Sequence, residues 1–393
     1  MSHDTEDRTI YTDEDDPIPY FYGTVDDYLD RTVLLFGGSG KGKTTVLEDI
    51  LYKLKSFIPN YLVIAPKTSE NVYIKKLPAR CIKQDLTKEM LLKIWERQEF
   101  ITEIYNTANN IDVLSSLFVK CPDRQALIMI KAIAQRAADR IRAIENSNLD
   151  FGSKKSQTAH INDLRSKKVK TLYKASIRQT KDKLSRMKLT DEEITALEYL
   201  DINPRFMLVV DDCSEKFEMW MKMFKKGEVN PINAIFFRGR WNFITFIFAA
   251  HDDKVVDTGL RKNARVTVYC GSKALMASLG KQGSGFTSQE KKLAQRMAGK
   301  LFVDEGTGDR RSKAIPTHKK LCYIATDTTP WKYHIADQHP EFRLGATSLY
   351  DLVKKMPKVE ANLSNNPFLK NLISSPKQSK KKRTPRYAKK KRR

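Results

Sequence analysis

A chain of 393 residues in which 40% of the side chains are hydrophobic can bury a sizeable core and form one large or two ordinary domains. Its net charge is +24, and its longest strongly apolar stretch, residues 243–250, is far shorter than the roughly 18 residues of a membrane span. The acidic N-terminus does not resemble a signal peptide, which makes secretion unlikely. The five scattered cysteines include no Cys-x-x-Cys pair, so we expect reduced thiols, no structural zinc and an intracellular protein.

The charge is unevenly distributed along the chain. Residues 1–30 hold ten acids and one base, residues 377–393 hold eleven bases and no acid, and the body between them carries +22. Clustered lysines and arginines attract phosphate backbones, because binding releases the counterions of the nucleic acid. The composition therefore indicates a polyanionic partner. Ordinary charge for solubility is the alternative.

The acidic residues 1–30 predict a flexible arm. Aspartate is abundant there, and Pro17 and Pro19 interrupt any regular element. We expect the arm to end near Tyr28 and ordered structure to begin at Thr32.

A strand, a helix and a second strand are predicted in succession from Thr32 onward. Residues 32–36 are a short β-branched and apolar run that stops at glycine, as a buried parallel strand does. Residues 43–57 place their apolar side chains on one face and are followed by Pro59, which predicts a helix, and residues 61–65 are a second apolar run. A β-α-β crossover of this kind is typical of an α/β protein.

Residues 88–202 have the pattern of helices, so we expect a basic helical insertion at about residues 100–203. Within residues 126–145 one apolar stripe has helical spacing and indicates packing against the core or against a partner helix: Leu127, Ile130, Ala134, Ala137, Ile141 and Ile144. Residues 154–188 contain twelve bases and two acids. Those bases form either a solvated face or a surface that faces DNA.

Strand character returns after Pro204. Four apolar runs are expected to complete a sheet of at least six strands: residues 205–210, 243–250, 265–270 and 320–325. The prediction is an α/β domain over residues 31–345, with a mostly parallel central sheet flanked by helices. Residues 346–373 are expected to form a C-terminal helical extension, and the lysine-rich residues 374–393 a disordered polybasic tail.

Residues 37–44 match the phosphate-binding pattern G-x-x-x-x-G-K-[ST] in full. They lie between a predicted strand and a predicted helix, where successive backbone N–H groups and the helix N-terminus converge on one phosphate. Lys43 is expected to contact the β- and γ-phosphates of ATP, and Thr44 to supply a hydroxyl for Mg²⁺. The predicted nucleotide-binding residues are Gly37, Gly38, Ser39, Gly40, Lys41, Gly42, Lys43, Thr44 and Thr45.

A P-loop NTPase needs a further carboxylate at the end of another strand, and Asp211 and Asp212 are the candidates. They directly follow an apolar run that ends at Val210. Asp211 is expected to hold Mg²⁺ through water, and Asp212 to orient or deprotonate the attacking water. The alternative is that the two carboxylates cap the N-terminus of a helix.

One histidine and several arginines complete the candidate set. His251 follows the apolar run 243–250, where a polar residue can sense the γ-phosphate, although a lone histidine there can also be purely structural. An arginine supplied to the phosphates of a neighbouring subunit would act as a finger. Four arginines flank this region: Arg238, Arg240, Arg261 and Arg265.

Together these residues resemble the packaging ATPases of large DNA viruses, the poxvirus type within the FtsK/HerA superfamily of ring-forming DNA translocases. The resemblance extends over residues 30–345. It is carried by residues 37–45, 61–66, 208–213, 237–240 and 260–263, by Leu91, Ile94 and Gln98, and more weakly by Tyr333 and His334.

The resemblance implies that Lys43 and Thr44 bind ATP·Mg²⁺, that Asp211 holds the metal and that Asp212 is the catalytic acid. It also implies a homo-oligomeric ring around duplex DNA, with capsid proteins as further partners. The basic body and insertion would then contact the DNA.

The resemblance leaves the finger and the sensor less well matched. Arg261 is the first candidate for the finger and Arg240 the second. His251 stands where the family usually has a sensor glutamine, and Trp241 where it often has histidine. A histidine can donate one hydrogen bond as glutamine does, but its charge depends on pH.

The function expected from these features is ATP-driven translocation that packages viral duplex DNA. The expected location is an infected host cell, at the virus assembly site or in the nucleus, or the virion itself. The basic blocks 380–383 and 389–393 suit nuclear import or DNA tethering. Two alternatives are a DNA helicase or replication-associated ATPase, and a DNA-binding virion protein whose ATP site is structural.

Overall fold

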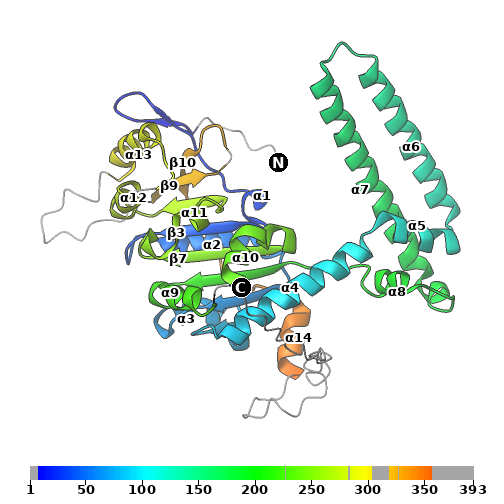
Figure 1. Cartoon of the computed structure of the whole chain (residues 1–393), viewed down its shortest axis with the longest axis horizontal. Coiled ribbons are helices and arrows are strands. Elements are labelled where there is room, and N and C mark those ends of the chain that lie inside the picture. Colours follow the sequence, from blue (N-terminus) through cyan, green and yellow to red (C-terminus); the bar gives the residue numbers. More distant parts are fainter. Residues whose placement is uncertain (1–7, 226, 282–283, 303–317, 326, 356–393) are drawn as a thin grey trace, which may run out of the picture. The chain divides into compact units, whose positions relative to one another are not determined.

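The computed structural model describes residues 8–225, 227–281, 284–302, 318–325 and 327–355 (Figure 1). The chain divides into two units, residues 1–346 and residues 347–393. In the second unit the described residues form helix α14, Thr347–Lys355, within the expected C-terminal extension. The predicted polybasic tail, residues 374–393, lies outside the described residues. No helix among the described residues combines the length and the apolar character needed to cross a membrane.

An eight-stranded, mostly parallel sheet lies at the centre of the first unit, in the order β10-β9-β8-β3-β7-β6-β4-β5 (Figure 1). The strands from β8 to β5 run parallel, while β9 and β10 pair antiparallel. Their bounds are β3 Thr32–Phe36, β4 Asn60–Ile64, β5 Ile82–Lys83, β6 Phe206–Asp211, β7 Ile244–Ala250, β8 Val266–Tyr269, β9 Lys319–Ile324 and β10 Trp331–Ile335. The predicted fold class is confirmed, and each predicted strand overlaps one of these.

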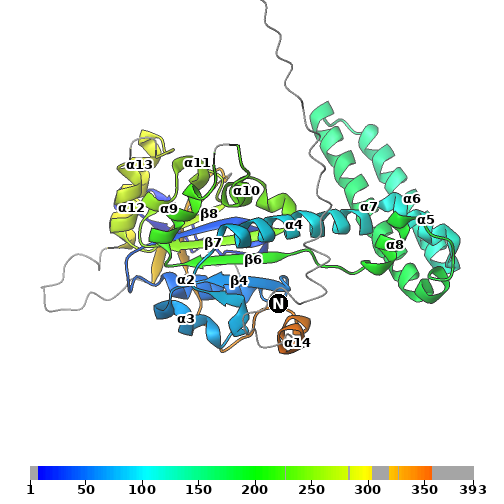
Figure 2. The same ribbon diagram turned by 60° about the horizontal axis from the view of Figure 1, so that its bottom comes forward.

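Helices cover both faces of the sheet, which is why β3, β6 and β7 are apolar and buried along their length. Figure 2 shows α2 (Lys43–Leu54) and α3 (Lys67–Ile74) on one face, and α9 (Ser214–Lys222) and α10 (Pro231–Arg238) on the other. The second face also carries α11 (Thr258–Arg261), α12 (Ser272–Leu279) and α13 (Ser288–Leu301). Its core joins Trp220, Leu275 and Met297 of these helices to the strands.

The flexible arm predicted for residues 1–30 is wrong for residues 8–30. These residues form β1 (Ile10–Tyr11), β2 (Pro17–Ile18) and α1 (Val25–Tyr28). Ile18, Phe21 and Tyr28 are buried in the first unit, and the Asp30 carboxylate is 3.1 Å from Nε of Arg205. The acidic composition was misleading, because its charges are paired with bases of the body and its few apolar side chains are buried.

The chain between β5 and β6 forms α4 (Lys88–Ala108), α5 (Ile111–Lys120), α6 (Arg124–Glu145), α7 (Phe151–Leu184) and α8 (Asp191–Glu198). A small separate core holds α5, α7 and α8 together: Val113, Leu114, Leu117, Ile177, Leu184, Ala196, Leu197 and Leu200. Helix α6 packs against α7 (Figure 1). In its apolar stripe Ala137 is buried while Leu127 is 39% exposed. The stripe therefore packs on a neighbouring helix and does not join the core of the sheet.

Candidate active site

The phosphate loop, residues 37–44, runs from the end of β3 into the first turn of α2. Gly40 and Gly42 have φ values of +72° and +82°, in the left-handed region that disfavours a Cβ. Gly37 lies so close to the end of β8 that a Cβ there would be 2.8 Å from the Cβ of Cys270. These positions need glycine for two different reasons, backbone angle and close approach.

The Lys43 side chain is nearly buried inside the loop. Its ammonium donates hydrogen bonds to the carbonyl oxygens of Gly37, at 2.6 Å, and Gly38, at 3.2 Å. A second ammonium is close by, because a Cβ on Gly42 would be 3.3 Å from Nζ of Lys320. Lys320 is buried in β9 and was missed by sequence reasoning, since only the pairing of β9 with β8 brings it to the loop. The loop therefore has two cationic groups beside it.

The register of the sheet brings the ends of three strands to one edge. Strand β7 lies between β3 and β6, with Phe36 opposite Ala250 and Asp211 opposite Ala249. Because adjacent strands are about 4.8 Å apart, Asp211 lies two strands, or roughly 10 Å, from the end of β3. The phosphate loop, the acid pair and His251 therefore share the carboxyl edge of the parallel strands.

Asp211 is buried, with 5% of its surface exposed. Burial raises the pKa of the Asp211 carboxyl, and a hydrogen bond from the hydroxyl of Tyr73, at 2.8 Å, opposes that rise. Tyr73 belongs to α3 and is fully buried. No sequence pattern marks it, because the contact joins segments that are 138 residues apart.

Asp212 and His251 form a pair at the same edge, with Nε2 of His251 2.8 Å from Oδ1 of Asp212. Asp212 has a φ of +54°, a left-handed conformation that is uncommon for a residue with a Cβ and often occurs at functional sites. Its backbone N–H donates to the carbonyl of Ala249 at 3.0 Å. The helix-capping alternative does not hold, because α9, whose residues are all described, follows a Cys213 N-cap without a side-chain hydrogen bond.

The structure separates the two finger candidates. The Arg261 guanidinium is ion-paired with buried Asp253 and hydrogen-bonded to Ser278, and only 8% of the Arg261 side chain is exposed. Arg261 is therefore engaged within its own chain. Arg240 is exposed in the turn η2 (Gly239–Asn242), before β7 and thus at the sheet edge opposite the phosphate loop.

A hollow of about 320 Å³ opens beside the first turns of α2. It is lined by Thr45, Glu48, Lys75, Lys76 and residues 337–342. The last of these segments follows β10 and contacts α2 through His339 and Asp49, so a stretch of chain far from the loop in sequence forms one wall of the hollow.

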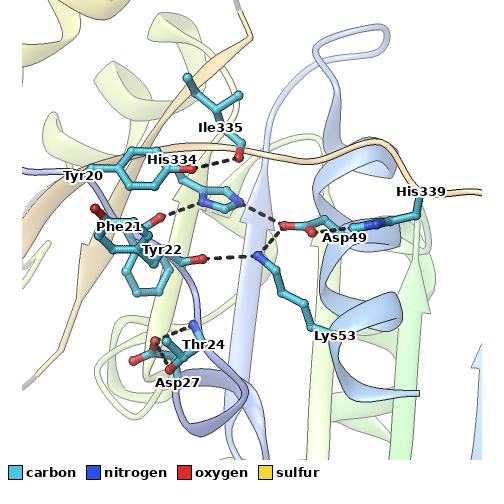
Figure 3. Close-up of polar contacts among 10 residues, drawn as sticks. All are labelled: Tyr20, Phe21, Tyr22, Thr24, Asp27, Asp49, Lys53, His334, Ile335 and His339. Atoms are coloured by element: carbon cyan, nitrogen blue, oxygen red, sulfur yellow. Dashed lines mark hydrogen bonds and ion pairs between the residues drawn. The ribbon is translucent and has the colours of Figure 1, made fainter. Parts of the chain in front are cut away.

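Asp49 of α2 anchors that wall (Figure 3). Its carboxylate is 3.3 Å from Nε2 of His334, 2.7 Å from Nε2 of His339 and 2.8 Å from Nζ of Lys53. Burial acts to raise the pKa of Asp49, but the hydrogen bonds from these three side chains lower it to about 2. The ring of His339 also stacks on Tyr52 at 3.8 Å. His334 was named from the sequence for another reason, and this cluster, whose members are up to 290 residues apart, was not predicted.

Comparison with known proteins identifies viral relatives. The chain is 26% identical over 364 residues to the uncharacterised protein B354L of African swine fever virus, isolate Pig/Kenya/KEN-50/1950, and the match covers 87% of this chain and 92% of the relative. The B354L protein of strain Badajoz 1971 Vero-adapted has the same identity and coverage. No protein-family model matches the chain.

Several solved structures overlap with the chain in part. The genome packaging NTPase B204 from Sulfolobus turreted icosahedral virus 2, in complex with ATP-gammaS, has 13% identity and a TM-score of 0.32 over 79% of this chain and 98% of that one. The pCW3 conjugation coupling protein TcpA has 12% identity and a TM-score of 0.34, over 78% of this chain and 61% of that one. TM-scores this low do not establish a common fold, so the fold class stands on the strand order and the phosphate loop.

Proposed function

We propose that this protein is an ATP-hydrolysing translocase that packages viral duplex DNA. One observation carries the proposal: the phosphate loop with Lys43, the buried Asp211 and the Asp212–His251 pair lie at the same sheet edge. A glycine-rich turn without a ligand would not need an acid pair two strands away. A phosphate-transfer site needs both.

The residues at this edge fit ATP with Mg²⁺. Thr44 and Asp211 offer hydroxyl and carboxylate oxygens, which are the ligands that Mg²⁺ prefers, and the ion usually takes only one or two carboxylates. Burial raises the pKa of Asp211, and a cation bound beside this carboxyl group would favour its charged form. When bound, Mg²⁺ neutralises charge on the β- and γ-phosphates. The hollow beside Thr45 is the space that we assign to the nucleoside.

The side chains then act in hydrolysis as follows. Lys43 exchanges the carbonyls of the loop for phosphate oxygens and holds the β- and γ-phosphates. Asp212 accepts a proton from water while the water oxygen bonds to the γ-phosphorus and the bond to the bridging oxygen of ADP breaks. His251 holds the Asp212 carboxylate through the 2.8 Å contact, which fixes the direction of the water.

Arg240 is the arginine that we propose as the finger. It is exposed, and its neighbours Phe237 and Trp241 are 52% and 69% exposed, as expected of side chains that a second subunit covers. In a homo-oligomeric ring this edge of one subunit would face the phosphate loop of the next. An arginine there would stabilise the charge of the transition state.

The substrate and the setting rest on charge and on the relatives. The body carries most of the net charge of +24, which suits a duplex DNA partner. The relatives are proteins of a virus, and the similarity covers 92% of their length, which supports a role in an infected cell. Packaging, with capsid proteins as partners, is the viral process that would use such a motor.

The first test is the steady-state ATPase rate of the whole chain with and without long duplex DNA. We expect duplex DNA to stimulate hydrolysis, and both Lys43→Ala and Asp212→Asn to abolish it. Gln289→Ala, an exposed change on α13, is a control outside the phosphate site and should leave the rate unchanged. Hydrolysis that is absent, or indifferent to DNA, would contradict a motor and favour a binding protein with a structural ATP site.

A second test separates packaging from unwinding. A duplex translocase should displace a third strand bound to duplex DNA without separating a forked substrate, whereas a helicase should open the fork.

A third test concerns the arginine finger. Arg240→Ala subunits and Lys43→Ala subunits should each be inactive alone and regain activity when mixed. In the mixed ring, a Lys43→Ala subunit still supplies Arg240 to an intact site. No recovery on mixing would contradict a finger in trans.

A further inference from the structure

A cluster of basic side chains outside the phosphate site lines a hollow between α6 and α7. Arg136 and Arg140 of α6 and Arg165 and Lys168 of α7 surround a space of about 130 Å³, which we call the basic hollow. All four side chains are exposed. Their separations of four and three residues put each pair on one helix face, with Cβ atoms about 5–6 Å apart. The rest of the lining is aliphatic: Ile133, Ala137, Ile161 and Leu164.

The four cations of the basic hollow have no counter-ion within the described part of the chain. Other bases of the same helices do have one: Arg142 is 3.8 Å from Asp139, and Lys167 is 2.7 Å from Asp163. A solvated helix face usually intersperses acids with bases, as those pairs do. Four like charges around one hollow repel one another, and an anion between them would remove that repulsion. The hollow therefore points to an anionic ligand.

The charge extends well beyond this hollow, which favours a polyanion over a small anion. Residues 124–184, which span both helices, hold fifteen bases and five acids, a net charge of +10. Lys167, Lys170 and Lys174 of α7 line a second hollow, which also contains Asp163, the partner of Lys167. The other side of this hollow includes Tyr105, Asn109 and Asn110, near the junction of α4 and α5. A ligand with regularly repeating charge can contact both hollows. Neither hollow includes a residue of the phosphate loop.

The side chains themselves indicate which polyanion binds. Three of the four cations in the basic hollow are arginines, whose forked donors match phosphate oxygens bidentately. The lining of the basic hollow contains no aromatic ring, and that of the second hollow has one, Tyr105, so there is no row of stacking platforms on which successive single-stranded bases could be held. Backbone contact without stacking suits a duplex. We propose that the α6–α7 pair binds the phosphate backbone of duplex DNA in the basic hollow; the choice of DNA as the polyanion rests on the proposed function.

The test compares two variants of the full chain with the same change of charge. In the first, Arg136, Arg140, Arg165 and Lys168 are all changed to Gln. In the matched control, four exposed bases of the same helices outside the hollow are changed to Gln: Arg124, Arg142, Lys155 and Lys181. Affinity for a 40-base-pair duplex is measured without nucleotide at several salt concentrations.

We expect the hollow variant to bind at least tenfold more weakly than the control. Each phosphate contact contributes about 0.9 to the magnitude of the slope of log K against log salt, so the loss of four contacts should reduce it by about 3.6 in the hollow variant, against less than about 1 in the control. Equal losses in the two variants would overturn the proposal, since the charge would then act without a specific site. Tighter binding of polyglutamate than of duplex would also overturn it, in favour of an acidic protein partner.

Two further readouts keep this inference apart from the proposed function. The ATPase rate without DNA should be the same in both variants and in the wild type. If the wild type does not hydrolyse ATP at all, the proposed function is refuted, but the comparison of DNA affinities still tests the basic hollow. The melting temperature of the hollow variant should be no lower than that of the wild type, because repulsion is removed. A fall of several degrees beyond the control would give the four cations a structural role and overturn the site.

Discussion

Replacement of Gly37 by alanine tests whether the phosphate loop is packed against the end of β8. The added Cβ would lie 2.8 Å from the Cβ of Cys270, whereas carbon atoms in contact are normally about 3.5–4.0 Å apart. Cys270 is fully buried, and its N–H donates to the carbonyl of Phe36 at 2.7 Å, so it cannot move away without breaking the sheet edge. Overpacking of this kind costs about 1–3 kcal/mol. We expect Gly37→Ala to lower the free energy of unfolding by that amount and to weaken nucleotide binding.

The assay is urea unfolding of four variants. Gly38→Ala is the matched control, because a Cβ there would be 3.9 Å from Cγ of Lys41, an ordinary contact. Cys270→Gly removes the opposing Cβ and should recover part of the loss when combined with Gly37→Ala, which gives a favourable coupling in the double-mutant cycle. If Gly37→Ala is as stable as Gly38→Ala, or if the double variant shows no coupling, the close approach of loop and strand is refuted.

Three further predictions concern single side chains. The lowered pKa of Asp49 stabilises the folded state above pH 4, by roughly 2 kcal/mol, and this contribution is lost as the pH falls from 4 towards 2. Asp49→Asn should therefore flatten the acid limb of the stability curve, and an unchanged limb would argue against the cluster. Arg261→Ala should destabilise the fold by about 1–3 kcal/mol, because it removes one of the two ion-pair partners of buried Asp253 and leaves Lys281, at 2.9 Å, as the other. Loss of turnover at full thermal stability would instead restore Arg261 as a finger. His251→Gln should keep measurable DNA-stimulated turnover, because glutamine can still donate a hydrogen bond to Asp212, whereas His251→Ala should lose most of it. Equal rates in the two variants would contradict a positioning role for His251.

Much of the architecture could be predicted from local patterns. The strands of this sheet are buried on both faces, so each is a continuous apolar run that can be recognised without knowledge of its partners. The phosphate loop follows one such strand and Asp211 ends another, and both belong to motifs that are contiguous in sequence. Strand β10 and the two-residue β5 were not predicted, because they are short or mixed in polarity and are defined by their neighbours.

The sequence by itself determined the class of fold, the phosphate loop and the acid pair, because each is a contiguous pattern whose chemistry does not depend on distant residues. Only the tertiary structure decided which charges are paired. It packs residues 8–30 onto the body, engages Arg261 with Asp253 and brings Tyr73 to Asp211. It also leaves the four cations of the basic hollow without an ion-pair partner among the residues that the structure describes. The amino-acid composition gives the number of charged residues but not which of them are in contact. The free energy of a charge depends on which group lies within a few ångströms of it and on how much water the fold excludes.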